Sequence, residues 1–361
     1  MRHKHYLSLT VLLLLSLSSF VYAQDSGLTH DFTPHPDNPI LPRGAEDAWD
    51  GENGLVFAPH VIVHDDTFYM FYSAADNPNG RPNAIGLATS DDGIVWEKYA
   101  DNPILAPDGE GYDSMCVSNG VPFVEPDGTW VMYYAANAIA CYGPGQTIAR
   151  ATAPAPEGPW PPDDEPLLES GTDGEWDDGF IMPHSVIATD DGYLMYYSGG
   201  TEYLVPLPRI VGMATSPDGL TWNKCNDPQT IAAPCAESDP IFTVDEEGDS
   251  HPFEAWAVSV LPTDDGYEMF YSSTCPDLVS QNCPAFLAYA TSEDGVNWQT
   301  YTEPEERLPM PGVCGDFACR RLTYPAAVRV DDGYHLYFTG CTDMEHDCEI
   351  GLATGTVNLG E

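Results

Sequence analysis

Hydrophobic and polar positions recur along this chain in a fixed order. Five aromatic segments each follow a polar turn, as expected of buried strands. They are YMFYS ending at Ser73, WVMYYA at Ala135, YLMYYS at Ser198, YEMFYS at Ser272 and YHLYFT at Thr339. Measured between Tyr72, Tyr134, Tyr197, Tyr271 and Phe338, the spacings are 62, 63, 74 and 67 residues. The pattern predicts five copies of one structural unit.

Each copy has the same internal order. An apolar run comes first, and an Asp-Gly turn and the aromatic strand follow. After a variable loop comes a strand of the type IGLATS, and a last short strand ends the unit. Four short strands per repeat, joined by turns rich in Gly, Asp and Pro, are typical of a propeller blade, and helical periodicity is almost absent. The sequence therefore predicts an all-β fold, a five-bladed β-propeller.

A Ser-x-Asp-Gly-x-x-Trp motif occurs at Ser90–Trp96, Ser216–Trp222 and Ser292–Trp298. We interpret it as the turn between the third and fourth strands of a blade. The repetition favours packing between neighbouring blades over ligand binding for these tryptophans and for Trp160.

The fifth copy ends before its last strand, and the missing piece is found near the N-terminus. HPDNPILP at 35–42 matches YADNPILAP at 99–107, and this alignment puts Phe32 in the place of Trp96. We therefore predict that residues 28–42 complete the last blade and close the ring, so that no edge strand is exposed.

The NPIL runs, IGLATSDDGIVWEK at 85–98 and the repeated segments of the type DDG-YMYYS resemble those of the five-bladed propeller glycosidases. These are glycoside hydrolase families 43, 62, 32 and 68, with the mannoside phosphorylases of family 130 as relatives. The resemblance implies a central funnel that binds sugar, with three carboxylates from the inner strands in the hydrolases. Calcium in the central channel is known among these relatives.

The chain departs from each family's motif at a defined place. Ala58 precedes Pro59 where family 43 typically has Asp, and WDGENG at 49–54 shares only the Trp and Asn-Gly of the family 32 motif. The nearest match to the family 130 run is ESDP at 237–240, which lacks the arginine. No complete catalytic set therefore carries over from the resemblance.

Residues 1–23 have the pattern of a secretory signal peptide, with Arg2 and Lys4 before an apolar stretch and VYA before Gln24. We expect residues 24–361 to form a single domain, secreted or periplasmic. Removing the leader's two cations leaves 10 Lys and Arg against 57 Asp and Glu, a net charge of −47. Such a charge argues against nucleic acid and anionic lipid as partners. We expect a monomer.

Ten cysteines in an exported chain predict up to five disulfides. Spacing favours local pairs, although the sequence leaves the connectivity open. The favoured pairs are Cys225–Cys235, Cys275–Cys283, Cys314–Cys319, Cys341–Cys348 and Cys116–Cys141. No residue pattern indicates a metal site or a cofactor.

Candidate catalytic residues are carboxylates that occur once at a predicted funnel position. Glu254, inside the apolar run HPFEAWAVSV, is the first candidate for the proton donor, because burial raises the proton affinity of a carboxylate. Hydrogen bonding to a neighbouring blade is an equally good reading of it. Glu52 and Asp178 are the candidate partner carboxylates.

Further residues at the predicted funnel are candidates for substrate binding. The repetition of Asp50, Asp113, Asp316 and Asp177 favours a structural role for these acids over a binding role. His184 parallels His60, so the pair is either structural or a pair of ligands. Arg321 is a candidate for a sugar hydroxyl or a uronate, or a neutraliser of the acidic rim. The remaining candidates are Asn53, Tyr203 and Trp256.

Two functions remain open at this level. One is an exported glycoside hydrolase that cleaves a poly- or oligosaccharide with Glu254 as acid, and the other is a propeller that binds a glycan or a protein without cleaving it. A phosphorylase would need a basic phosphate pocket, for which Arg81, Arg320 and Arg321 are the candidates.

Overall fold

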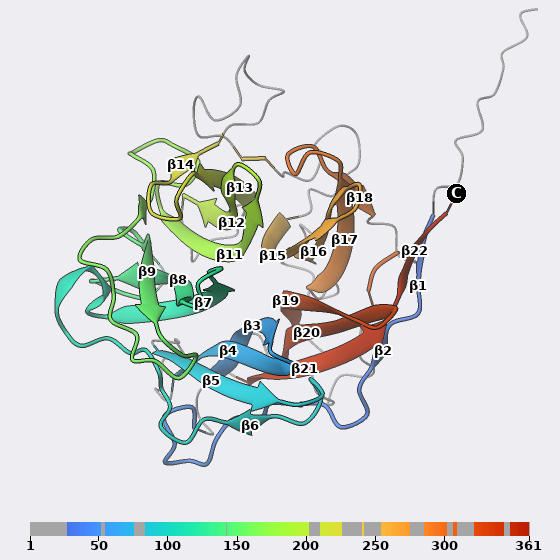
Figure 1. Cartoon of the computed structure of the whole chain (residues 1–361), viewed down its shortest axis with the longest axis horizontal. Helices are drawn as coiled ribbons and strands as arrows, with labels where there is room; N and C mark the ends of the chain where they lie inside the picture. Colours follow the sequence, from blue (N-terminus) through green and yellow to red (C-terminus); the bar gives the residue numbers. More distant parts are fainter. Residues whose placement is uncertain are drawn as a thin grey trace, which may run out of the picture.

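The computed structural model describes residues 27–51, 55–75, 84–141, 143–201, 210–225, 240–241, 254–274, 285–301, 306–308, 321–342 and 347–360. Five four-stranded antiparallel sheets are arranged in a ring, each with its first strand nearest the centre (Figure 1). The predicted five-bladed β-propeller is confirmed. The helical content of the described residues is one short 3₁₀ turn, η1 (Gly111–Asp113).

The blades follow the order of the chain. Blade 1 consists of β3 (Leu55–His64), β4 (Thr67–Ala75), β5 (Ala84–Ser90) and β6 (Glu97–Lys98). Blade 2 consists of β7 (Cys116–Val124), β8 (Trp130–Asn137), β9 (Thr147–Ala153) and β10 (Leu168–Glu169). Blade 3 consists of β11 (Phe180–Thr189), β12 (Gly192–Gly200), β13 (Ile210–Ser216) and β14 (Asn223–Lys224). Blade 4 consists of β15 (Glu254–Thr263), β16 (Gly266–Thr274), β17 (Phe286–Ser292) and β18 (Gln299–Tyr301).

Blade 5 contains strands from both ends of the sequence, as predicted. It consists of β19 (Arg321–Val330), β20 (Gly333–Cys341), β21 (Cys348–Gly355) and, as its outer strand, β2 (Thr33–Pro34). A further two-stranded sheet pairs β1 (Leu28–His30) with β22 (Val357–Leu359) beside this blade (Figure 1). The N-terminal segment thus closes the ring.

Hydrogen bonds confirm that the N-terminal segment occupies the place of a regular blade segment. In blade 1 the Asn102 side chain accepts from the Leu87 nitrogen at 2.8 Å and donates to the Leu87 oxygen at 2.8 Å. In blade 5 Asn38 makes the same pair of bonds to Leu352, both at 2.9 Å. The two NPIL runs therefore make the same hydrogen bonds in blades 1 and 5.

A ring of aromatic contacts joins each blade to the blade before it. In every blade the Trp, or Phe32 in blade 5, lies against an aromatic residue from the second strand of the preceding blade. In these five pairs the ring centroids are 5.6–6.1 Å apart, and the angles between the ring planes are 78–87°. The pairs are Trp96–Tyr337, Trp160–Phe71, Trp222–Tyr133, Trp298–Tyr196 and Phe32–Phe270. The predicted packing of the tryptophans between blades is confirmed.

The Ser-x-Asp-Gly-x-x-Trp motif forms the predicted turn. Ser90 Oγ accepts from the Gly93 nitrogen at 2.9 Å, and Asp92 Oδ1 accepts from the nitrogens of Ile94 and Val95. Backbone donors, that of Val95 first, hold the pKa of Asp92 below its usual value. Gly93 has a φ of 71°, which explains the glycine.

The aromatic partner of each Trp is matched to the turn that it faces. Tyr196 donates to the Gly295 oxygen at 2.9 Å, and Tyr133 and Tyr337 donate to the corresponding glycines, Gly219 and Gly93. Phe71 and Phe270 face the two segments that lack this motif. In the segment that Phe71 faces, the Trp160 indole nitrogen donates to the Pro156 oxygen. A hydroxyl is thus present where a turn glycine accepts it.

This matching predicts that stability falls both when a tyrosine hydroxyl is removed and when a hydroxyl is added to one of the phenylalanines. We expect Tyr196→Phe to lower the free energy of unfolding by about 1 kcal/mol, because one buried hydrogen bond is lost. Phe71→Tyr is expected to lower it by about 1–3 kcal/mol, because the added hydroxyl is buried where no turn glycine accepts it. Equilibrium denaturation in urea measures both. Increased stability of Phe71→Tyr would show that the turns do not select the residue.

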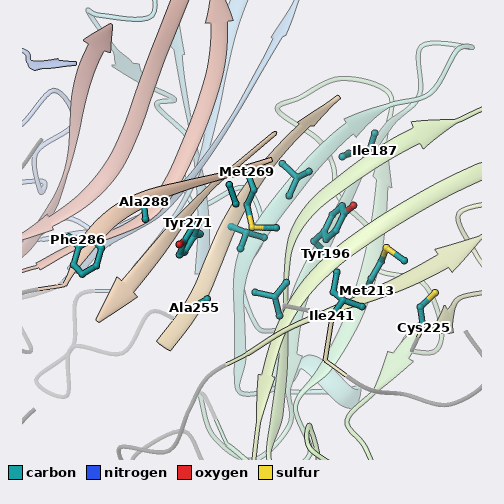
Figure 2. Packing of buried hydrophobic residues seen from close by; sticks show 14 residues of the cluster. Ile187, Tyr196, Met213, Cys225, Ile241, Ala255, Met269, Tyr271, Phe286 and Ala288 are labelled. Carbon is teal, nitrogen blue, oxygen red and sulfur yellow. The ribbon is translucent and has the colours of Figure 1, made fainter. Parts of the chain in front are cut away.

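The interior is a series of apolar clusters between adjacent blades. Figure 2 shows the one between blades 3 and 4, where Tyr196 and Met213 of blade 3 lie near Met269 and Tyr271 of blade 4. Each sheet buries both faces in this way, so the strands have continuous hydrophobic runs. The blades are therefore held by their neighbours, and the ring is a cooperative structure.

Two of the predicted disulfides are confirmed, Cys116–Cys141 and Cys341–Cys348. Cys225 is also disulfide-bonded, and the three remaining predicted pairings involve cysteines outside the described residues. Disulfides are typical of proteins that fold in an oxidising compartment. Within the described ranges, no helix has the length and apolar character needed to cross a membrane.

Candidate functional site

The centre of the propeller is built from irregularities in the five inner strands. Each inner strand has a β-bulge where its pairing with the second strand shifts. The bulges lie at equivalent places in the five blades, so their residues form a ring, called here the bulge ring. Its members are Ala58, Asn119, His184, Ala257 and Tyr324, and all except His184 have φ between 50° and 52°.

Hydroxyl side chains fix the bulge ring. Ser73, Ser272 and Thr339 stand at the end of the aromatic runs, and each accepts the bulge N–H of the next blade around the ring. Their oxygens bind the nitrogens of Asn119, Tyr324 and Ala58 at 2.8, 2.9 and 2.9 Å. A left-handed conformation costs free energy for residues other than glycine, and these bonds stabilise it. The Ser or Thr that closes each of these runs therefore positions the inner strand of its neighbour.

Most of the bulge ring belongs to an apolar cluster. Ala58, Ala257 and Tyr324 are buried together with Phe57 and Trp256. The Tyr324 ring has its centroid 5.1 Å from the centroids of both Phe57 and Trp256, in edge-on contacts. None of the five ring positions is a carboxylate. An acid and base pair would therefore have to come from segments that lead into the inner strands.

Two histidines lie in the same central region as neutral groups. His184 Nε2 is 2.8 Å from Ser198 Oγ, and its ring centroid is 6.1 Å from that of Tyr324. Burial lowers the pKa of His60 to about 4, and burial together with nearby His60 holds the pKa of His184 well below its usual value. Both side chains are therefore uncharged near pH 7, and His184 is hydrogen-bonded to Ser198.

Two of the three predicted catalytic residues, Glu254 and Asp178, lie where inner strands begin. Glu254 is the first residue of β15, and its backbone pairs with Thr274. Glu52 lies outside the described residues. Asp178 is half-buried just before β11, and its Oδ2 accepts from the Gly174 nitrogen at 2.7 Å, which places it in a local turn. The catalytic role of all three stays a prediction.

Asp50 and Asp177 occupy the same position in blades 1 and 3. Asp50 Oδ2 lies 2.6 Å from Lys98 Nζ and accepts from the Tyr72 hydroxyl at 3.3 Å. Asp177 Oδ2 lies 2.7 Å from Lys224 Nζ, and the Tyr197 hydroxyl donates to it at 3.2 Å. Each acid thus joins the entry loop of a blade to the second and fourth strands of that blade. This placement supports the structural reading of the repeated acids, and substrate binding stays a prediction.

Asp113 has the tyrosine of this arrangement but not the lysine. The Tyr134 hydroxyl donates to its Oδ2 at 3.0 Å, and no ion pair of Asp113 occurs among the described residues. Burial raises the pKa of Asp113 above its usual value. The structure therefore places three predicted binding residues in three separate blades and does not bring them together.

The other predicted binding residues divide between described and undescribed positions. Trp256 is 1% exposed, and the guanidinium carbon of Arg321 lies 5.7 Å from the centroid of its ring. Trp256 packs against Tyr324 in the central cluster, so Arg321 and Trp256 are brought together beside the bulge ring. Asn53 and Tyr203 lie outside the described residues.

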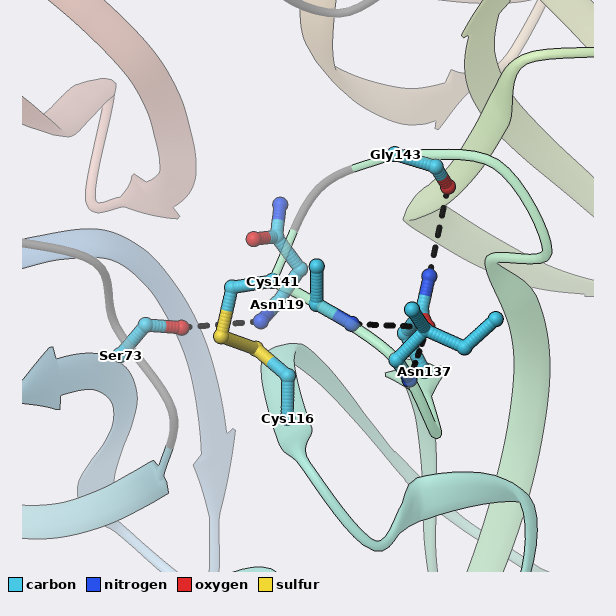
Figure 3. Close-up of a disulfide and its surroundings, with 8 residues drawn as sticks. Ser73, Cys116, Asn119, Asn137, Cys141 and Gly143 are labelled. Atoms are coloured by element: carbon cyan, nitrogen blue, oxygen red, sulfur yellow. Dashed lines mark hydrogen bonds between the residues drawn. A yellow bond between two sulfur atoms is a disulfide. The ribbon is translucent and has the colours of Figure 1, made fainter.

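Asn119 is a site residue that the sequence reasoning missed. Its side chain is fully buried, and neither the amide oxygen nor the amide nitrogen has a hydrogen-bond partner among the residues that the structure describes. Figure 3 shows its backbone nitrogen bonded to Ser73, with the amide group turned away from the Cys116–Cys141 disulfide. The signal in the sequence was a polar residue in the apolar run CVSNGVPFV, where the other ring positions are mostly apolar.

A pocket of about 620 Å³ opens at the other end of the inner strands, away from the entry segments. Its wall is mostly apolar, from Val61 and Phe68 of blade 1 to Leu261 of blade 4 and Val328 of blade 5. Arg329, which also lines it, donates to the Pro262 oxygen at 2.6 Å and to Glu268, so its charge is compensated. The described part of the pocket wall contains none of the predicted site residues.

Solved structures similar to this one include glycoside hydrolases. The fold is similar to that of BT0996, solved in an RGII complex, with a TM-score of 0.68 and 19% identity over 87% of this protein and 91% of that one. It is also similar to a glycoside hydrolase of Parabacteroides distasonis, with a TM-score of 0.66 and 17% identity over 93% and 99%. The protein therefore has the five-bladed propeller fold of the glycoside hydrolases.

The family 117 glycoside hydrolase Zg3597 of Zobellia galactanivorans shares the fold at a TM-score of 0.57, with 17% identity over 92% of this protein and 91% of that one. No protein-family model matches the sequence. Two curated relatives, the uncharacterized proteins MT1551 and Rv1502 of Mycobacterium tuberculosis, are each 26% identical over 176 residues, which is 48% of this protein. The match spans about half the length of these relatives, 52%.

Proposed function

We propose that this protein is an exported carbohydrate-active propeller that hydrolyses glycosidic bonds at the end of the channel where the inner strands begin. The observation that carries the proposal is the placement of Glu254 at the start of β15, two residues before Trp256. Glu254 thus begins the inner strand of blade 4, the strand that carries Trp256 of the central cluster and Ala257 of the bulge ring.

In this proposal the protein supplies acid and base chemistry without a metal. Glu254 protonates the oxygen of the leaving group, and Glu52 or Asp178 serves as the base that activates water or as the nucleophile. Glu52 is the better partner, because the Oδ2 of Asp178 is already engaged in a local turn. The disulfides and the leader at 1–23 support a location outside the cytoplasm.

A second function is favoured by the composition of the bulge ring. Ala58 stands where family 43 enzymes have Asp, and the ring contains His184 and Asn119 but no carboxylate. A propeller with this ring could hold a saccharide by hydrogen bonds and apolar contact without cleaving it. The two functions differ in whether a carboxylate pair reaches the bound glycosidic bond.

Hydrolysis of a panel of aryl glycosides, arabinan, xylan, fructan and mannan by the purified protein tests the proposal. We expect Glu254→Gln to reduce kcat by about a hundredfold or more while the melting temperature stays near that of the unaltered protein. Glu293→Gln is the matched control, because it makes the same change at an exposed turn of the same blade.

Each other result has a defined meaning. Equal activity of Glu254→Gln and Glu293→Gln would remove Glu254 as the acid. Lack of hydrolysis across the panel, together with a rise in melting temperature on adding one of the glycans, would establish the binding function instead. Absence of both would contradict the carbohydrate proposal.

A further inference from the structure

Asn119 contrasts sharply with a second asparagine close to it. Asn137 Oδ1 accepts from the nitrogens of Ile139 and Ala140, and its Nδ2 lies 3.3 Å from the oxygens of Gly143 and Pro144. The Asn137 amide is therefore saturated and holds the turn that carries Cys141 (Figure 3). The Asn119 amide, equally buried, has no bond at either end within the described part of the protein.

A buried amide without partners is unfavourable, because it has lost its bonds to water and gained none. Native proteins rarely retain such a group unless a ligand or an ordered water completes it. The backbone of Asn119 is held firmly, since Ser73 binds its nitrogen and the Cys116–Cys141 disulfide lies three residues before it. The backbone that carries the amide is thus fixed in place.

Asn119 lies at the centre of the propeller, at the level of the bulge ring. Three other members of the bulge ring, Ala58, Ala257 and Tyr324, lie in the central cluster, and Asn119 is their equivalent in blade 2. A ligand that enters where the inner strands begin would meet this ring. Asn119 is the member of the bulge ring that has a side-chain amide.

An amide selects among ligands by what it can donate and accept. It provides two N–H donors and one oxygen acceptor. A carboxylate could use only the donors and would leave the amide oxygen unbonded. Sugar hydroxyls both donate and accept, so two neighbouring hydroxyls complete the whole amide. The net charge of the sequence, −45, also disfavours a polyanion.

We infer that Asn119 hydrogen-bonds a pair of hydroxyls on the bound saccharide and thereby selects a neutral sugar unit. This inference rests on the proposed binding of saccharide in the channel. Asn119 acts here by binding, whether or not the glycan is then cleaved.

Glycan affinity and the stability of the free protein, measured on the same variants, test the inference. We expect Asn119→Gly to weaken binding of neutral glycans from the panel roughly tenfold, because two sugar hydroxyls lose their partner. The same change is expected to raise the melting temperature without ligand, since it removes the unbonded amide and suits a φ of 52°. Asn119→Asp, which removes the donors and adds a charge, is expected to weaken binding at least as much.

Asp66→Gly is the matched control for the backbone. Asp66 has a φ of 61° in the exposed hairpin between β3 and β4, so this change relieves the backbone without touching the ring. Its glycan affinity is expected to equal that of the unaltered protein. The difference between the stabilisation by Asn119→Gly and that by Asp66→Gly measures the cost of burying the amide without hydrogen bonds.

The possible failures are distinguishable. Unchanged affinity of Asn119→Gly, or a preference of the unaltered protein for polygalacturonate over neutral glycans, would overturn this inference and leave saccharide binding intact. A lower melting temperature of Asn119→Gly without ligand would show that the amide is already satisfied by an ordered water, which also overturns it. If the unaltered protein binds neither neutral nor acidic glycan, the proposed function itself fails.

Discussion

A protein that begins at Arg43 is expected to melt roughly 5–10 °C below one that begins at Gly27. The shorter form lacks β1 and β2, so blade 5 loses its outer strand and β21 becomes an exposed edge. It also lacks Phe32, which is 6% exposed and lies against Phe270 of blade 4. Loss of one buried Phe side chain costs about 3–5 kcal/mol, and a domain of this size loses only a degree or two per kcal/mol.

The form beginning at Gly27 is the reference, since it keeps both strands and the Asn38 bonds to Leu352. Phe32→Ala in that reference separates the aromatic contact from the strand. We expect it to account for about half of the loss, measured by calorimetry. Equal melting temperatures for the forms beginning at Gly27 and Arg43 would mean that the ring closes without its N-terminal strand.

Asp177→Asn is expected to lower the free energy of unfolding by about 3–5 kcal/mol. Asp177 is fully buried, and its partner Lys224 has only 15% of its side chain exposed. Removing the negative charge leaves a buried ammonium group without compensation. Asp50→Asn is expected to cost somewhat less, because the Lys98 side chain is more exposed, at 26%. Urea denaturation at pH 7 measures both.

Asp113→Asn provides the internal control for this prediction. Asp113 holds the same place in blade 2, but the described residues supply it with no cation. Its raised pKa means that the folded state favours the protonated form of Asp113. The stability that this form contributes is therefore lost as the pH rises through the pKa of the folded state. The neutral amide should therefore leave stability at pH 7 unchanged or increase it. Equal losses for Asp113→Asn and Asp177→Asn would contradict the role given to Lys224.

A double variant completes the cycle. Lys224→Met alone leaves the Asp177 carboxylate buried without its cation, whereas Asp177→Asn with Lys224→Met removes both charges. We expect the double variant to be more stable than either single variant, since paired removal of buried charges is often close to neutral. Additive losses would show that the pair contributes nothing beyond its separate groups.

The blade architecture is recorded locally in the sequence. The Ser90–Trp96 turn forms from bonds within six residues, and its glycine is required by a φ of 71°. Local turns of this kind repeat with the aromatic strands at a regular spacing, so five copies imply five blades. Even the closure of the ring was predictable, because the HPDNPILP segment repeats the blade sequence that the last copy lacks.

The site was harder to predict from the sequence, since its residues come together only when five blades meet. Asp50 and Asp177 stood out as acids near a predicted funnel, yet each reaches a lysine 47 or 48 residues away on the outer strand of its own blade. Asn119 was not predicted, because only the folded structure shows that its buried amide has no hydrogen bond. Glu254 is recognisable in sequence as a lone acid in an apolar run, but its partner carboxylate depends on how the entry segments converge.

The sequence by itself thus determined the all-β class, the number of blades and the packing of tryptophans between them, because these depend on contacts within a repeat or between equivalent repeats. Only the tertiary structure decided which groups share the centre. The bulge ring exists because inner strands from five blades approach one axis, and hydroxyls of neighbouring blades hold it in place. Chemistry on a pseudo-symmetric ring depends on the positions that break the symmetry, and in this protein Asn119 and His184 break it.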